Sequence, residues 1–159
     1  MSAPAMEAVS ARTLVDEDFF TRLSLRVAKS HGLDKARAEA ITDQALAYLA
    51  TSAQKPADAP TLYMSAAVDP AWHTFMEFTA AYDEFFRRPG WHKVHHAPCD
   101  GFGGATYPAP EKALPPTVEA ILAAGYTVIP GLWTAMVDCG DTCGDDGGQP
   151  DPLPCGDHG

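Results

Sequence analysis

The sequence predicts an all-α fold: a compact bundle of about four helices with a long Gly/Pro-rich loop and an irregular Cys/Gly/Asp-rich C-terminal tail. Apolar residues recur at helical spacing in segments that begin near Val15, Asp34 and Asp69. Residues typical of helix starts and stops flank these segments. A chain of 159 residues is also the size of one ordinary domain. We therefore expect three regions: a disordered N-terminus over residues 1–12, a helical domain over residues 13–136 and an acidic, Cys-rich tail over residues 137–159.

The first two predicted helices form a hairpin. The first has an apolar stripe with acidic residues in its first turn, and Gly32 follows where a helix would stop. After this short turn, Asp34 can cap a second helix that ends near Ala53. The apolar stripes consist of Val15, Phe19, Phe20, Leu23, Val27 and Ala28 in the first helix, and of Ala38, Ile41, Ala45, Leu46 and Leu49 in the second. Helices joined by so short a turn should pack against each other.

A third helix is predicted after a proline-rich linker. Ser65 or Asp69 can cap it, Pro70 suits its first turn, and the segment from Arg87 to Gly90 ends it. So much of its surface is apolar that most of the helix must be buried. The residues on this surface are Trp72, Phe75, Met76, Phe78, Thr79, Tyr82, Phe85 and Phe86.

The rest of the chain predicts less regular structure. Residues 99–116 are rich in glycine and proline, which indicates a surface loop. A short fourth helix is expected from Thr117 to Ala124, where Gly125 stops it. An extended piece should follow, before Leu132 and Trp133 anchor the chain to the helical domain.

Charge and composition exclude several kinds of partner. The formal net charge is −10, and six aspartates lie beyond Val137 in a segment without Lys or Arg. Binding to nucleic acid or to anionic lipid requires clustered cations. No segment has the roughly 20 apolar residues of a membrane span, and the first residues do not follow the signal-peptide pattern. We therefore expect a cytoplasmic protein with no nucleic-acid or membrane partner, in which cysteines are thiols or metal ligands.

Four of the six histidines lie within 24 residues, at positions 73, 92, 95 and 96. Asp69 precedes His73 by four residues and therefore shares its face of the predicted helix. That carboxylate can hold one imidazole nitrogen and leave the other for a ligand, as at metal sites and general bases. Two or three neutral imidazoles with an open position suit iron, copper or zinc. In the alternative interpretation, His95 and His96 lie on a solvent-facing loop and His73 simply bonds to Asp69.

The cysteines also allow several interpretations. Cys139 and Cys143 have a spacing found in structural zinc sites, and Cys155 with His158 could complete four ligands. Cys99 could instead join Cys139, Cys143 and the adjacent histidines in a mixed nitrogen and sulfur site. A thiolate nucleophile at Cys99 is formally possible beside an imidazole. The plainest interpretation is an acidic tail that carries accessible thiols.

At these residues the chain resembles the glycine-rich domain-containing proteins, and small actinobacterial versions resemble it over most of its length, from Val15 to Cys143. The shared motif residues are Asp69, Trp72-His73-Thr74, Tyr82, His95-His96-Ala-Pro98, Gly125-Tyr126-Thr-Val128 and Leu132-Trp133. The resemblance implies an all-helical fold and a functional centre at His73, His95 and His96, but it carries no settled activity. One departure is Phe78, which stands where the family commonly has another histidine. His92 or a cysteine could substitute for that imidazole.

We expect a metal-dependent protein, specifically an oxidative tailoring enzyme that uses iron or copper on a small molecule or peptide. The ligands would be His73, His95 and His96, with Asp69 orienting His73 and Tyr82 as a hydrogen-bond or redox partner. Further candidate ligands are Cys99, Cys139 and Cys143. Two alternatives stay open: a non-catalytic binding module stabilised by zinc, and a helical carrier or leader domain whose Cys-rich tail is the working part. A Phe-rich helix face also allows a homo-oligomer.

Overall fold

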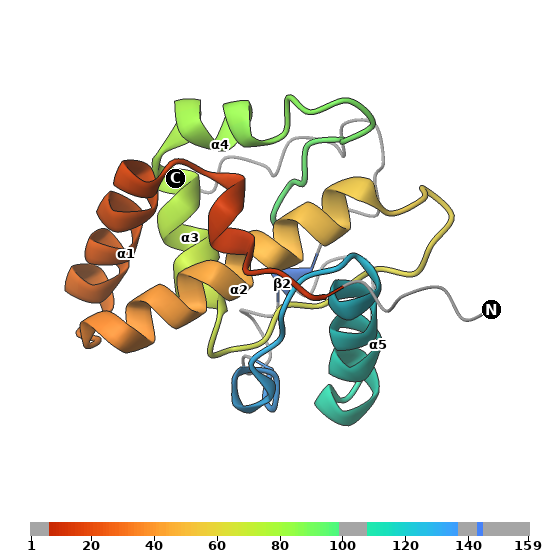
Figure 1. Cartoon of the computed structure of the whole chain (residues 1–159). Coiled ribbons are helices and arrows are strands. Elements are labelled where there is room, and N and C mark those ends of the chain that lie inside the picture. The colour runs from red at the N-terminus through yellow and green to blue at the C-terminus, as the bar shows by residue number, and fades with distance from the viewer. Residues whose placement is uncertain (1–6, 99–107, 137–142, 145–159) are drawn as a thin grey trace, which may run out of the picture.

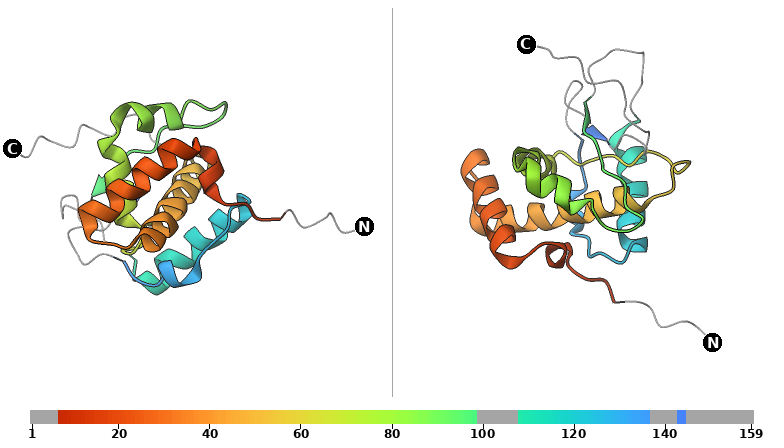
Figure 2. Two further views of the ribbon diagram at one scale, coloured as in Figure 1. Left: turned by 60° about the vertical axis from the view of Figure 1, so that its left-hand side comes forward. Right: turned by 90° about the horizontal axis from the view of Figure 1, so that it is seen from above.

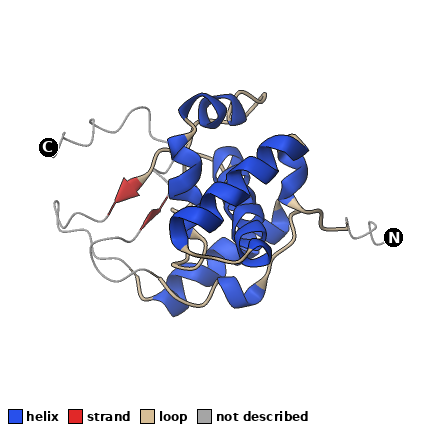
Figure 3. Ribbon diagram, turned by 90° about the vertical axis from the view of Figure 1, so that its left-hand side faces the viewer, coloured by secondary structure: helices blue, strands red, loops and turns tan. Residues whose placement is uncertain are grey.

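The computed structural model describes residues 7–98, 108–136 and 143–144, and it confirms the all-α class. Five α-helices make up the fold (Figures 1 and 3): α1 Glu17–His31, α2 Lys35–Gln54, α3 Asp69–Glu77, α4 Thr79–Phe85 and α5 Pro110–Ala123. Short 3-10 helices cover Ala11–Leu14 and Pro130–Leu132. Two-residue strands, β1 Ala97–Pro98 and β2 Cys143–Gly144, pair antiparallel. No helix of the described part is long and apolar enough to cross a membrane.

Helices α1 and α2 form the predicted hairpin, with Asp34 as the predicted cap of α2, whereas Asp16 caps α1 rather than lying in its first turn. The side chain of Asp16 accepts a hydrogen bond from the Phe19 N–H at 2.8 Å, and Asp34 accepts one from the Arg37 N–H at 2.8 Å. Gly32 ends α1 in the left-handed conformation, with φ of 63°. Residues other than glycine rarely adopt this backbone conformation, so Gly32 permits the chain to reverse direction between α1 and α2.

Helix α2 is the centre of the fold. It runs through the middle of the molecule, with α1 against its first half and α5 near its other end (Figures 1 and 2). Helix α3 packs against both α1 and α2. All residues of α2 from Ile41 to Ala53 are buried. A helix that is buried on every side needs small residues where its neighbours approach, and the alanines of α2 meet this need.

The expected third helix is two helices, which corrects the prediction of one continuous segment to Phe86. The break is at Phe78, whose backbone has φ of −89° and ψ of 64°. A straight helix cannot bury so wide an apolar surface against one neighbour. The bend lets Phe75 in α3 make edge contacts with both Tyr82 and Phe85 in α4, with ring centroids 5.1 Å and 5.5 Å apart.

The start of the fourth helix was also predicted wrongly. Helix α5 begins at Pro110 rather than at Thr117, so residues 110–116 belong to a helix and not to the predicted loop. Pro115 and Pro116 lie inside this helix and remove two backbone donors. Burial of Ala113 and Leu114, which are 3% and 2% exposed, stabilises this first part against that loss. Residues 99–107 of the predicted loop lie outside the described residues.

Part of the segment predicted to be a disordered N-terminus is ordered. Val9 forms a parallel bridge with Tyr126, in which the Val9 N–H donates to Gly125 O at 2.9 Å and the Thr127 N–H donates to Val9 O at 3.0 Å. The side chain of Asp43 in α2 accepts hydrogen bonds from the Ser10 hydroxyl and the Arg12 N–H. The N-terminal segment therefore belongs to the domain from Val9 on.

Gln44 in α2 connects the helical core to residues 127–133, here called the C-terminal segment. Its Oε1 accepts hydrogen bonds from the Ile129 N–H at 3.0 Å and the Trp133 indole N–H at 2.9 Å. Its Nε2 donates to Thr127 O at 2.9 Å and to Asp43 Oδ2 at 3.0 Å. Leu132 and Trp133 are buried, as the sequence predicted. One amide thus satisfies a backbone carbonyl, a backbone N–H and a buried indole N–H from three different residues.

We expect the Gln44→Leu substitution to lower the free energy of unfolding by about 3–5 kcal/mol, because it leaves several buried polar groups without partners. Urea denaturation followed by circular dichroism measures this change. Gln54→Leu is the matched control, since Gln54 lies on the same helix but is exposed and donates only to Ala50 O. Equal effects of the two substitutions would contradict the role given to Gln44.

Candidate metal centre

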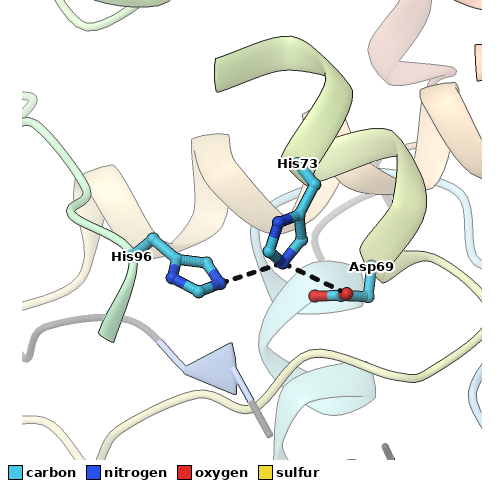
Figure 4. A group of neighbouring side chains, drawn as sticks. All are labelled: Asp69, His73 and His96. Atoms are coloured by element: carbon cyan, nitrogen blue, oxygen red, sulfur yellow. Dashed lines mark hydrogen bonds and ion pairs between the residues drawn. The ribbon is translucent and has the colours of Figure 1, made fainter. Parts of the chain in front are cut away.

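Helix α3 presents Asp69 and His73 on one face because its other face is buried. Trp72 and Phe75 are 0% and 1% exposed, and the Trp72 ring lies 5.3 Å from the Tyr48 ring of α2. This packing fixes the rotation of the helix about its axis. Asp69 and His73, which are four residues apart, are thereby held on one side of the helix (Figure 4).

Two hydrogen bonds position the segment that carries His96. The indole N–H of Trp72 donates to the Tyr82 hydroxyl at 3.0 Å, and this hydroxyl donates to Val94 O at 2.7 Å. Val94 is fully buried, so the chain two residues before His96 is fixed against the core. The Trp72 ring also meets the His96 ring edge-on, with centroids 4.9 Å apart. Trp72 is therefore the sequence neighbour of His73 and the ring neighbour of His96.

The side chains of Asp69, His73 and His96 converge (Figure 4). The Nε2 atom of His73 lies 3.1 Å from His96 Nε2 and 3.3 Å from Asp69 Oδ2. One ligand atom from each residue lies within 4.8 Å of the others. Atoms that bind a metal at about 2.1 Å are roughly 3.0–3.4 Å apart at angles of about 90–109°. The two short distances therefore match the spacing of neighbouring ligands of one metal ion.

The position of the Asp69 carboxylate relative to His73 differs from the prediction. We expected its carboxylate to hold one nitrogen of His73 while the other nitrogen faced a ligand. Instead, the same nitrogen, Nε2, faces both Asp69 and His96. Asp69 therefore lies on the ligand side of His73 and is itself a candidate ligand.

The second oxygen of Asp69 supports this assignment. Oδ1 is buried and makes no hydrogen bond within the described residues. A buried carboxylate oxygen without a partner costs free energy, because it loses its water and gains no donor. A cation bound at the carboxylate would remove that cost. The donor set and the unsatisfied oxygen are thus compatible with a bound metal ion.

The electrostatic environment keeps His96 available as a ligand. Burial lowers the pKa of His96, the nearby His73 lowers it further, and the Asp69 carboxylate opposes the shift. A lower pKa extends the neutral form of the imidazole to lower pH. Because a metal binds the neutral form, His96 is ready to act as a ligand at neutral pH.

The other predicted site residues are placed differently. His95 is not part of the cluster and lines a neighbouring pocket. The Tyr82 hydroxyl is occupied by Trp72 and Val94, so Tyr82 positions the site rather than facing it. The backbone N–H of His92 donates to Ala53 O at 3.0 Å, away from the cluster.

The cysteine predictions lie largely outside the described residues. Cys99 and Cys139 are not described, nor is the side chain of Cys143. The backbone of Cys143 is described, and it pairs with Pro98, two residues after His96. The backbone of Cys143 therefore lies beside the segment of the second histidine.

Sequence reasoning treated Trp72 only as a core residue and missed its hydrogen bond to Tyr82. A signal for it was present, because buried tryptophan and tyrosine usually need partners for their polar atoms. The two residues are ten positions apart within the predicted third helix. A straight helix would not have suggested that they meet.

The fold and the cluster define the class of this protein, which is a small helical domain with a candidate metal centre of two imidazoles and one carboxylate. No family model matches the chain, and no match is found among curated proteins or solved structures. The resemblance to the glycine-rich domain-containing proteins therefore stays a prediction. It rests on motif residues that include Asp69, His73 and Tyr82.

We expect Tyr82→Phe to lower the free energy of unfolding by about 2–4 kcal/mol and to loosen residues 94–96, because it leaves the Trp72 N–H and Val94 O without a partner. Urea denaturation measures the first effect and amide hydrogen exchange the second. Tyr126→Phe is the control, since the Tyr126 hydroxyl makes no hydrogen bond within the described residues although the ring is buried. Unchanged exchange at residues 94–96 would show that Tyr82 does not position His96.

Proposed function

We propose that this protein binds one iron(II) ion through Asp69, His73 and His96 and uses it to oxidise a small molecule or peptide with molecular oxygen. The observation that carries the proposal is the position of His73 Nε2, which lies within 3.1–3.3 Å of one imidazole nitrogen and one carboxylate oxygen. Three protein ligands leave other coordination positions of a metal open for oxygen and substrate.

The composition of the ligand set favours iron over copper. Two imidazoles and one carboxylate are the ligands of the non-haem iron(II) oxygenases. Imidazole-rich sites without a carboxylate are more typical of copper. Zinc also uses two histidines and a carboxylate, so it is the main competitor for this site. Metal identity therefore decides between oxidative and purely Lewis-acid chemistry.

Access to the centre is consistent with a small substrate. The His73 side chain is 46% exposed, whereas that of Asp69 is 15% exposed. A ligand can therefore reach the metal from the side of His73, while the carboxylate stays largely screened from water. We propose a substrate without a large polyanionic surface, because the chain is strongly acidic. A cytoplasmic location is part of the same proposal.

We expect the untagged protein, purified without oxygen and loaded with iron(II), to bind about one equivalent of metal. Single substitutions Asp69→Ala, His73→Ala and His96→Ala should each weaken binding by at least about 100-fold, since each removes a ligand. Elemental mass spectrometry and competition with a chelator measure the content and the affinity. Oxygen consumption with candidate substrates then tests the activity.

His95→Ala is the matched control for His96→Ala, because the two histidines are adjacent but only His96 belongs to the cluster. His31→Ala is a second control, because His31 lies on α1 and contacts Thr74 at 3.2 Å. Both controls should keep the metal. Loss of metal in the His95 variant alone, or no metal in the wild type after reconstitution, would refute the proposed centre.

A second candidate function is a zinc-stabilised module in which tail thiolates complete the ligand set. The observation that favours it is the pairing of β1 with β2, which brings the Cys143 backbone beside the segment after His96. Under this alternative, the double substitution Cys139→Ala/Cys143→Ala should remove zinc, because thiolates are preferred zinc ligands. The iron proposal predicts that the same variant keeps its metal. The metal content of this one variant therefore separates the two functions.

A further inference from the structure

A pocket of about 270 Å³ lies beside the candidate metal centre. It is formed between the end of α3, helix α4 and the segment that carries His96. The His96 side chain lines this pocket and also belongs to the cluster with Asp69 and His73. The two sites therefore share one residue, His96, which would be in contact with both a metal ion and a molecule in the pocket.

Helix α3 continues from the cluster into the pocket. Met76, which lines the pocket, follows His73 by three residues and lies one turn further along the same face of the helix. Met76 is partly buried and gives this end of the pocket an apolar, adaptable surface. An apolar group of a bound molecule can therefore lie against Met76 close to the metal ligands.

The pocket carries one negative and one positive side chain. Asp83 from α4 and Lys93 from the segment between α4 and β1 form an ion pair with an N–O distance of 2.5 Å. Lys93 lowers the pKa of Asp83, so the carboxylate is ionised at neutral pH. The two side chains are 49% and 43% exposed. An exposed ion pair of this kind contributes only about 0–1 kcal/mol, so a ligand that offers both charges can replace it at little cost.

We propose that this pocket binds a free α-amino acid as the substrate of the metal centre. Its ammonium group pairs with Asp83, its carboxylate pairs with Lys93, and its side chain lies against Met76 towards His96. A ligand with a single charge satisfies only one member of the pair and leaves the other without its partner. The volume is below the roughly 300–1,000 Å³ of sites for drug-sized ligands, which suits a single amino acid better than a peptide. This inference rests on the proposed function, since it names the substrate class for that centre.

The binding of L-leucine tests the inference. It is measured on the metal-free protein and on the zinc-loaded protein, by calorimetry and by the NMR shifts of Lys93 and His95. Zinc replaces iron here because it does not react with oxygen. Isoamylamine and 4-methylpentanoate are leucine without the carboxylate and without the ammonium group, respectively. Each should bind at least about tenfold more weakly than leucine, and leucinamide should resemble isoamylamine.

The variants Asp83→Asn and Lys93→Gln should each weaken leucine binding by about 10-fold to 100-fold and leave the metal content unchanged. Arg26→Gln and Glu77→Gln are matched controls, because these residues form an exposed ion pair, 3.2 Å apart, outside this pocket. They should leave leucine binding unchanged.

The outcomes separate this inference from the proposed function. Metal bound without any leucine binding overturns the inference and leaves the metal centre intact. Equal affinity for leucine and leucinamide, or for leucine and either single-charge analogue, also overturns it. Leucine binding that requires Asp83 and Lys93 in a protein that takes up no metal supports the ligand class while refuting the metal-dependent function.

Discussion

The burial of α2 on every side is the constraint on which the rest of this structure depends. A helix without a solvent-facing side must be covered by all of its neighbours, and α1, α3, α5 and the N-terminal segment supply this cover. Polar atoms inside the cover must find partners, because water cannot reach them. Gln44, Asp43 and Tyr48 meet this requirement by binding segments that are remote in sequence, namely the C-terminal segment, residues 10–12 and Leu62 O. The core thus determines where irregular parts of the chain lie.

The candidate centre is a consequence of this core. Tyr48 of α2 packs against Trp72, and that contact sets the rotation of α3. Once Trp72 and Phe75 point inward, the residues at the other side of the helix must point outward, and Asp69 and His73 are among them. The break at Phe78 then lets α4 fold back, so that the Tyr82 hydroxyl reaches both Trp72 and the backbone of the His96 segment. The spacing between the two imidazoles is therefore set by hydrophobic packing and two buried hydrogen bonds.

The sequence predicted those features that local chemistry determines. Gly32 and Asp34 act within one helical turn, so their roles could be assigned without knowledge of the fold. The same holds for Asp69 and His73, which share a helix face. The break at Phe78 was not predictable, because it depends on how much apolar surface the neighbours can cover. The helical start at Pro110 was missed for a similar reason, since burial of Leu114 outweighs the helix-breaking tendency of Pro115 and Pro116.

Which of His95 and His96 faces His73 depends on the fold and not on the local sequence. Adjacent residues in an extended segment point in opposite directions, so at most one of the two can face His73. The sequence contains nothing that decides which one. In the structure, the decision is made by Val94, which is fully buried and whose carbonyl accepts the Tyr82 hydrogen bond. With Val94 directed into the core, the alternation along the segment brings His96 to the Trp72 ring and to His73, while His95 lines the adjacent pocket. The identity of the second imidazole is therefore determined by a buried valine that takes no part in binding.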